Sequence, residues 1–221
     1  LGSIRAMITP DLGSAAMSHA YSSIFADRTS LFRHHFATAI DASPDFTDGD
    51  NCFEVLRGVN FVAAHGARVR DHRDSLSPNV VDNVDRGLAY SLADVAEAHL
   101  QQSRIARAWL DQFEDIDVVI CPAASSTPFP HEQWAVGEID GEAMETYMRW
   151  LGITYLPTMA LACGVALPCG LDQAGMPFGI QVLSAPGNDR LVAEVAKALE
   201  SVLQCHDATR RPLPDLDSLR S

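Results

Sequence analysis

The sequence has little positive charge and almost no lysine. Its 221 residues include 16 Lys and Arg against 29 Asp and Glu, and Lys197 is the one lysine. The net charge of −13 at pH 7 repels phosphate backbones, so we expect no direct contact with nucleic acid. A mechanism that needs a lysine as proton acceptor could use Lys197 alone, and we expect its stem to pack on the surface of a helix.

The sequence also lacks a long uninterrupted apolar run and a signal peptide. The longest apolar stretch, 155–171, contains two prolines and two glycines, so we expect no membrane span. The first residue is Leu1, and no charged segment followed by an apolar one stands at the start. We therefore expect that an upstream portion of the protein is missing from this sequence.

Cysteine is too scarce and too scattered for a disulfide framework. The count of five is odd, no two form a C-x-x-C pair, and three stand in apolar runs. We expect buried, reduced thiols, which suit the cytoplasm. The five residues are Cys52, Cys121, Cys163, Cys169 and Cys205.

Recognisable catalytic and metal-binding motifs are missing as well. There is no G-x-S-x-G nucleophile turn, no H-E-x-x-H metal motif and no glycine-rich phosphate loop. The adjacent His34 and His35 would point to different faces of a helix, which suits the surface better than a metal site. The sequence therefore predicts no catalytic residue in this chain, no metal and no cofactor.

What is present is a mixture of apolar strands and amphipathic helices. Short apolar runs between turn residues predict buried strands, and apolar residues at helical spacing predict helices. The expected strands are 4–8, 36–40, 117–122, 164–167 and 178–183. The expected helices are 18–32, 91–113, 141–151 and 189–202, with near-helical spacing also at 53–62 and a long loop at 123–139. This mixture indicates an α/β fold.

Two of the helices carry specific signals. Ser91 and Asp94 resemble a capping box for the helix 91–113, whose apolar face is expected to include Leu92 and Leu100. Asn188 is expected to cap the final helix. The continuous apolar runs of the strands from 117 onward predict that they share one central sheet covered on both faces.

Several segments, taken in order, are similar to a known protein family. The stretch 164–181, which reads GVALPCGLDQAGMPFGIQ, resembles the closing signature of the amidase-signature family: a strand ending Pro-x-Gly, a turn, then Gly-x-Pro-x-Gly-x-Gln. Residues 188–200 resemble the final helix of that family. Further similar segments are 4–13, 113–122, 127–130, 139–141 and 147–150. The chain departs from the family at 158–162 and at Cys163-Gly164, which suggests a divergent member.

The resemblance implies a fold and an activity. The fold would be the C-terminal part, 1–205, of a mixed-sheet α/β/α sandwich, with a mobile tail at 206–221. The activity would be hydrolysis of a small-molecule amide to an acid plus ammonia or an amine, through an acyl-enzyme on serine. The Ser–cis-Ser–Lys triad of the family lies in an N-terminal segment that nothing here matches. We expect the chain alone to be inactive and to bind its missing N-terminal catalytic portion.

The resemblance also suggests where substrate would be contacted. Aromatic and polar residues on or beside the long loop are candidates, because binding residues often lie on loops. These candidates are Phe129, Trp134, Tyr147, Trp150 and Thr158. Arg104 falls near the position where some relatives place an arginine for a substrate carboxylate. Gln181 would lie inside the sheet, where we favour a core amide over a substrate contact.

Two alternatives to a hydrolase remain open. The first is the A subunit of a tRNA-dependent amidotransferase, which would use the same chemistry with partner subunits. The second is a non-catalytic amidase-like binding module. Exposed sheet edges would also allow a homodimer.

Overall fold

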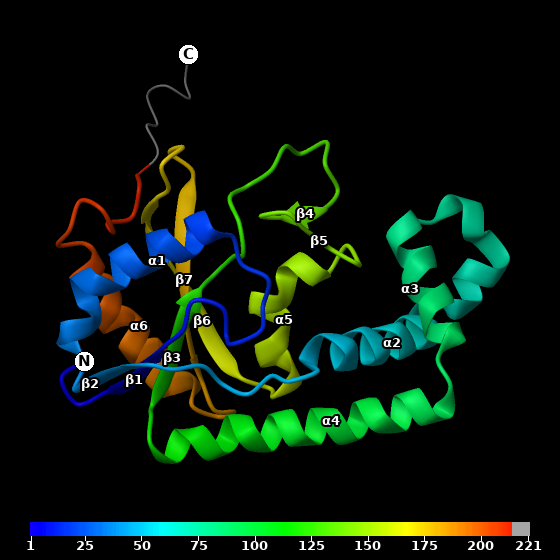
Figure 1. The fold of residues 1–221 in the computed structure, drawn as a ribbon, viewed down its shortest axis with the longest axis horizontal. Coiled ribbons are helices and arrows are strands. Elements are labelled where there is room, and N and C mark those ends of the chain that lie inside the picture. Colours follow the sequence, from blue (N-terminus) through cyan, green and yellow to red (C-terminus); the bar gives the residue numbers. More distant parts are fainter. Residues whose placement is uncertain (214–221) are drawn as a thin grey trace.

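The computed structural model describes residues 1–213 and is built on a five-stranded mixed sheet with the strand order β2-β1-β3-β7-β6 (Figure 1). The strands are β1 (Arg5–Ile8), β2 (Thr38–Asp41), β3 (Val118–Pro122), β6 (Cys163–Leu171) and β7 (Pro177–Ser184). β1 is parallel to both β2 and β3, and β7 is antiparallel to β3 and β6. A small hairpin of β4 (Glu138–Ile139) and β5 (Glu142–Ala143) stands apart from the sheet.

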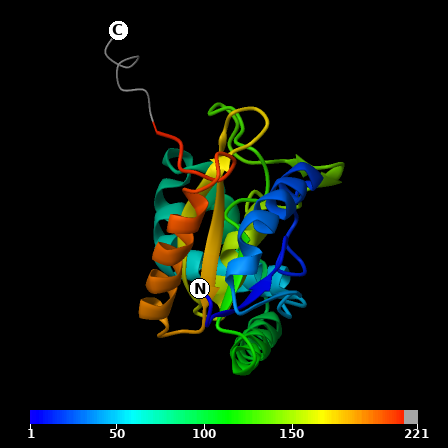
Figure 2. The same cartoon turned by 90° about the vertical axis from the view of Figure 1, so that its left-hand side faces the viewer.

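Helices cover both faces of the sheet. The α-helices are α1 (His19–Phe32), α2 (Gly49–His72), α3 (Pro78–Ala89), α4 (Leu92–Asp111), α5 (Gly152–Met159) and α6 (Asp189–Leu203). Short 3-10 turns lie at η1 (Arg33–His35), η2 (Arg73–Ser75), η3 (Gln112–Glu114) and η4 (Arg149–Leu151). α1 and α6 pack on one face, and α4, α5 and the first half of α2 pack on the other. Figure 2 shows α6 lying along the strands.

The two layers follow from the alternation of side chains along each strand. In β3, Val118 and Ile120 join the layer under α1 and α6, whereas Val119 and Cys121 join the layer under α4 and α5. All five residues of β3 are buried, as its continuous apolar run predicts. The prediction of one sheet that contains β3, β6 and β7 is confirmed.

The prediction of cover on both faces is wrong for β6. This strand forms one edge of the sheet within residues 1–213, and its first residues alternate between partly buried and exposed. Gly164 and Ala166 are exposed. β2 forms the other edge and is also largely exposed. Both edges therefore present backbone N–H and C=O groups that the described residues leave available for pairing.

An arm of two helices projects beyond the sheet (Figure 1). The second half of α2 packs against α3, a helix that the sequence analysis did not predict. The helices come close at Gly58 and Gly87, because a Cβ on Gly87 would lie 2.3 Å from the Gly58 carbonyl oxygen. Glycine at this crossing thus permits backbone contact that any larger residue would prevent.

The helix predicted at 91–113 is confirmed as α4, together with its capping box. Ser91 Oγ accepts a hydrogen bond from the Asp94 backbone N–H (3.2 Å), and Asp94 accepts one from the Ser91 N–H (2.8 Å). The prediction of its apolar face was partly wrong, since Leu92 is 85% exposed and Leu100 is 48% exposed. The first turns of α4 pack against α2, where Ala98 is buried, and Leu92 and Leu100 lie on the side of the helix that faces solvent.

Two other local predictions were wrong. Residues 141–151 form strand β5, bends and a 3-10 turn, and the α-helix begins only at Gly152. Asp140 and Gly141 have φ values of +50° and +89°, which favour a tight hairpin over a helix start. Asn188 occupies the N-cap position of α6, but its side chain donates to Ser184 Oγ (3.0 Å) instead of accepting from the helix.

The segment after α6 folds back onto the sheet. Thr209 is fully buried, and its hydroxyl donates to the Leu203 carbonyl at 2.7 Å. Residues 214–221, the rest of the tail that the sequence analysis expects to be mobile, lie outside the described residues. Within residues 1–213, no helix combines the length and the apolar character that a membrane crossing requires.

Candidate functional site

A pocket opens beyond the carboxyl ends of β1 and β2. β1 lies between β2 and β3 in the sheet. The chain runs from β1 through α1 to β2, its neighbour on one side, whereas β3 is its neighbour on the other side. Open α/β sheets form ligand crevices at such points, where neighbouring connections diverge. A cavity of about 350 Å³ lies here, and we call it the switch-point pocket. Its polar lining residues are Asp11, Ser14, His19, Ser22, Asp50, Glu142 and Arg149.

The loop after β1 forms one wall and is held rigidly. Buried Thr9 accepts a hydrogen bond from the Leu12 N–H (3.0 Å), and its hydroxyl contacts Ser43 Oγ at 2.8 Å. Leu12 and Gly13 both adopt the left-handed conformation, with φ of +55° and +83°. A leucine in this region costs about 1–2 kcal/mol, and its complete burial offsets that cost. The loop thereby fixes Asp11 at the mouth of the pocket.

The start of α1 connects this wall to the end of β3. The Ser18 side chain caps the helix by accepting from the Tyr21 N–H (3.1 Å), and the Ser18 N–H donates to the Ser125 carbonyl (2.9 Å). Ser125 is fully buried, and its hydroxyl has no partner within residues 1–213. His19 contacts Asp140 of the small hairpin through its backbone N–H (2.5 Å) and its ring Nδ1 (3.2 Å). Three segments distant in sequence therefore meet beside the pocket.

A cluster of charges forms the floor. Arg149 lies 2.8 Å from Asp50, 3.1 Å from Glu54 and 3.1 Å from Glu145. The arginine joins the turn η4 to the first turns of α2, and all but Glu145 are well shielded from solvent. Charge-assisted bonds in such surroundings are short and directional. This cluster fixes the geometry of the floor.

Tyr155 completes the cluster. Its hydroxyl donates to Asp50, and its ring stacks on Phe53 with centroids 4.0 Å apart. Burial raises the pKa of the Tyr155 phenol, and the hydrogen bond to the Asp50 carboxylate raises it further. The phenol therefore stays protonated at neutral pH and acts as a hydrogen-bond donor. It cannot act as a general base there.

The pocket has polar groups but no assembled nucleophile. His19 lines it together with Ser14 and Ser22, yet no hydrogen bond joins the imidazole to either serine in the described part of the chain. Lys197 is exposed on α6, on the opposite face of the sheet. No group of three or more His, Cys, Asp or Glu side chains suited to a metal ion occurs within residues 1–213. The arrangement can bind and orient a polar ligand.

The structure brings two of the predicted substrate residues together. Phe129 and Trp150 pack edge to face, with ring centroids 5.4 Å apart. Trp134 lies on the same long loop but is 77% exposed. The pair Phe129–Trp150 therefore forms a defined aromatic surface, whereas Trp134 makes little contact with the rest of the described chain.

The other predicted substrate residues lie elsewhere. Tyr147 accepts from Arg57 (2.7 Å) and from Asn83 (3.1 Å) at the base of the helical arm. Thr158 lines a separate cavity of about 380 Å³ between α2 and α4. Arg104, with 59% of its side chain exposed, contacts Gln101 on α4. The six candidates do not form one site, and substrate contact by each remains a prediction.

Gln181 acts as the sequence analysis expects of a core amide. Its side-chain N–H group donates to the Pro122 carbonyl (2.9 Å) and to the Ile153 carbonyl (3.1 Å). These bonds tie the end of β3 to α5 across the sheet. They hold the strand end and the helix in one position beside the long loop.

Sequence reasoning missed the residues that form the pocket floor. Asp50 was not predicted as a site residue, and Arg149 and Tyr155 were not considered as its partners. Asp50 and Arg149 are separated by 99 positions, so no local pattern connects them. The only local signal was the position of Arg149 among aromatic residues in an acidic chain. That signal does not show which carboxylate the arginine would contact.

Comparison with known proteins identifies relatives of the chain. The sequence model of the family described as Amidase matches residues 67–193, more than half of the chain. The acylamidase of Rhodococcus erythropolis is 22% identical over 204 residues, which cover 90% of this chain and 42% of that protein. The A subunit of glutamyl-tRNA(Gln) amidotransferase from Cyanothece sp. (strain PCC 7425 / ATCC 29141) is 29% identical over 143 residues, which cover 62% and 28%. The chain thus spans less than half the length of these relatives.

Solved structures share the fold. A crystal structure described as that of an amidase superposes with a TM-score of 0.79 at 18% identity, over 90% of this chain and 46% of that chain. A bacterial aryl acylamidase of the amidase-signature family superposes with a TM-score of 0.75 at 16% identity, over 96% and 46%. At identities this low, the agreement establishes the fold and nothing more specific.

Proposed function

This chain belongs to the amidase family, and we propose that the whole protein hydrolyses a carboxylic amide to an acid plus ammonia or an amine. The observation that carries the proposal is the match of residues 67–193 to the amidase family model, and the free edge of the sheet at β6 supports the part of it that assigns catalysis to a further segment. The chain ends its sheet there, while structures that share its fold are about twice as long. The free edge supports a fold that continues into a further part of the protein.

In this proposal the described chain has a supporting role. It supplies five strands, the helices that cover them, and the switch-point pocket as one wall of the substrate site. The nucleophilic serine would come from the Ser–cis-Ser–Lys region that the family resemblance implies and that this chain lacks. The position of Lys197 supports this division, because it is exposed on α6, on the opposite face of the sheet from the switch-point pocket.

The missing catalytic portion would bind along β6. Gly164 and Ala166 are exposed on this strand, and Leu161 just before it is 75% exposed. Small side chains on an edge strand allow close approach of another backbone, and an exposed leucine adds apolar surface. In the chain alone the same edge would be available for pairing with a second copy, which would give a homodimer.

The test compares two proteins in one assay. One protein is the 221-residue chain, and the other is the longest protein whose reading frame includes this chain. Each is incubated with a panel of primary and aryl amides. We expect turnover by the longer protein and none by the chain, with or without Lys197→Ala. Turnover by the chain that Lys197→Ala abolishes would make this lysine catalytic and would overturn the division of roles. A genomic start codon immediately before the codon of Leu1 would favour a non-catalytic module.

The aromatic pair Phe129–Trp150 is the strongest of the proposed substrate contacts. Its edge-to-face packing on the long loop gives it a fixed shape, which suits binding of an apolar part of the amide. Replacing Trp150 by alanine in the longer protein should raise KM more than it lowers kcat. Kinetic constants that both stay unchanged would place the residue outside the substrate site.

The similarity to the A subunits of amidotransferases supports a second candidate function. A protein of this kind would release ammonia from an amide and pass it to a partner. The net charge of −13 does not argue against this role, because a partner could hold the RNA. Co-purification of two further chains with the protein would favour this candidate. A cytoplasmic location is part of the proposal, and the free cysteines suit that compartment.

A further inference from the structure

The segment after α6 forms a rigid cover over the end of β6. Gly170 has a φ of +84°, and a Cβ at this position would lie 2.0 Å from the Ala208 carbonyl oxygen. Together with the buried Thr209, this close contact fixes residues 207–210 against the strand. The segment is therefore a built wall of the molecule.

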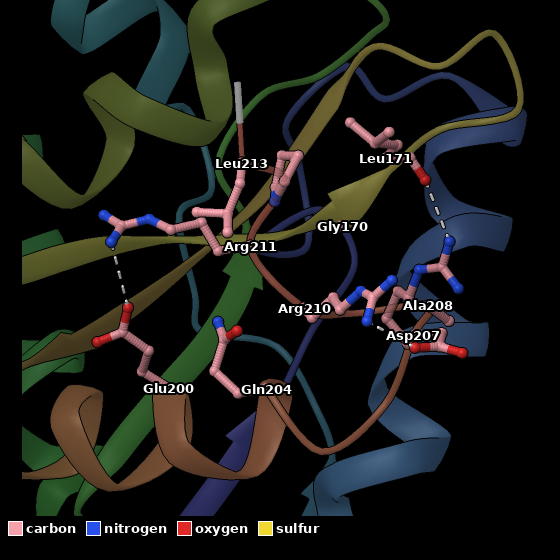
Figure 3. A pocket seen from close by; sticks show the side chains of 11 residues that line it. Gly170, Leu171, Glu200, Gln204, Asp207, Ala208, Arg210, Arg211 and Leu213 are labelled. Atoms are coloured by element: carbon pink, nitrogen blue, oxygen red, sulfur yellow. Dashed lines mark hydrogen bonds and ion pairs between the residues drawn. The ribbon is translucent and has the colours of Figure 1, made fainter. Parts of the chain in front are cut away.

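A cavity of about 960 Å³ lies between this wall, α1 and α6 (Figure 3), and we call it the tail pocket. Three arginines from two distant segments line it: Arg28 from α1, and the adjacent Arg210 and Arg211 from the segment after α6. Two carboxylates, Glu200 and Asp207, line it as well. The lining thus has a net positive charge in a chain whose net charge is −13.

The arginines differ in how well their charges are paired. Arg210 lies 3.1 Å from Asp207, whereas Arg211 is 3.9 Å from Glu200, which is long for an ion pair. Arg28 donates to the Leu171 carbonyl at 3.1 Å and forms no ion pair within residues 1–213. A carbonyl orients the guanidinium but does not neutralise it. Arg28 therefore presents to the cavity a partly buried guanidinium that pairs with no carboxylate within residues 1–213.

We propose that the tail pocket binds a small molecule that carries an oxyanion, either a carboxylate or a phosphate group. The planar guanidinium of Arg28 can bind two oxygens of such a group, with Arg211 as the second cation. Leu171 and Leu213 line the same cavity and would contact the apolar remainder of the ligand. None of these residues lines the switch-point pocket, so the proposal is independent of amide hydrolysis.

The experiment is a titration of the full chain with inorganic phosphate, and separately with acetate, at constant ionic strength maintained with chloride. Backbone amide NMR shifts of Gly170 and Ala208 report on the pocket. We expect saturable shifts with a Kd of about 1 mM for phosphate. Arg28→Gln and Arg211→Gln should each weaken binding roughly tenfold, because each removes charged hydrogen bonds.

Arg190→Gln is the matched control. Arg190 lies on the same α6 layer, its side chain is 92% exposed, and it pairs with Glu194, so its loss should leave the Kd unchanged. Saturable shifts with acetate alone would support the site and identify a carboxylate as its ligand. Shifts that do not saturate, or equal weakening by Arg190→Gln and Arg28→Gln, would overturn the proposal. Because Arg211 lies on the segment after α6, its variant tests the site even if Arg28→Gln fails to fold.

Discussion

The switch-point pocket and the tail pocket lie beyond the ends of strands of the same sheet, yet they are built in opposite ways. In the first, Arg149 is surrounded by three carboxylates and its charge fixes the position of other residues. In the second, Arg28 has a carbonyl partner, and its charge remains available. The comparison suggests two roles for an arginine beside a cavity. With several carboxylates nearby it holds neighbouring residues in position, whereas without them its charge can bind a ligand.

The largest expected effect comes from breaking the wall of the tail pocket. Gly170→Ala would place a Cβ 2.0 Å from the Ala208 carbonyl oxygen and strain a φ of +84°. We expect a loss of about 3 kcal/mol in the free energy of unfolding, from overpacking and strain together. Urea denaturation measures it.

Gly175→Ala is the control for this substitution. Gly175 has a φ of +78°, but nothing lies within 4 Å of its added Cβ. Only the backbone strain of about 1 kcal/mol should therefore appear. Equal losses for the two variants would show that the contact with Ala208 contributes nothing to stability.

The floor of the switch-point pocket gives the next largest effect. Arg149→Met would leave Asp50, Glu54 and Glu145 without their shared cation. We expect a loss of about 2–3 kcal/mol, since two of these carboxylates are largely shielded from water. Arg190→Met, at an exposed pair with Glu194, should leave the free energy of unfolding nearly unchanged. Thermal melts that show similar losses for both would contradict a structural role for Arg149.

A smaller effect is expected from Tyr155→Phe. The change removes one hydrogen bond to Asp50 but keeps the stacking on Phe53. Because Asp50 retains Arg149, the loss should be about 1 kcal/mol. In the background of Arg149→Met the same change should cost more, since Asp50 would then lose its last partner. Additive losses would show that the two residues do not act as one unit.

The smallest effect on stability is expected from a substitution of Asp117, which lies at the end of the sheet away from both pockets. Asp117 accepts from the Arg5 backbone N–H at 2.7 Å and from the Arg5 guanidinium at 2.9 Å, and these bonds lower its pKa. Its contribution is present above the unfolded pKa of about 4 and is lost as the pH falls through the lower folded value. Asp117→Asn should therefore reduce stability by up to about 1 kcal/mol at pH 7 and by less near pH 2.

Melts of the wild-type chain and of Asp117→Asn across this pH range give the measurement. Neither pocket contains Asp117, so phosphate binding should be unaffected by the substitution. A stability difference that stays constant with pH would show that the carboxylate charge is not the cause.

Local patterns in the sequence determined much of the sheet and its helices. The apolar run of β3 predicted a strand buried on both faces, and Ser91 with Asp94 predicted the start of α4. The order of motifs up to Gln181 indicated the amidase family, which the match over 67–193 supports. These features depend on residues close together in the chain, so the sequence alone is enough to find them.

Tertiary structure alone decided which side chains meet. Asp50 reaches Arg149 across 99 positions and Tyr155 across 105, and Arg28 approaches the segment after α6 from the other end of the chain. The sequence contained these residues but gave no rule for pairing them. Ion pairs and cavities depend on distances in space, and only the packing of helices on the sheet sets those distances.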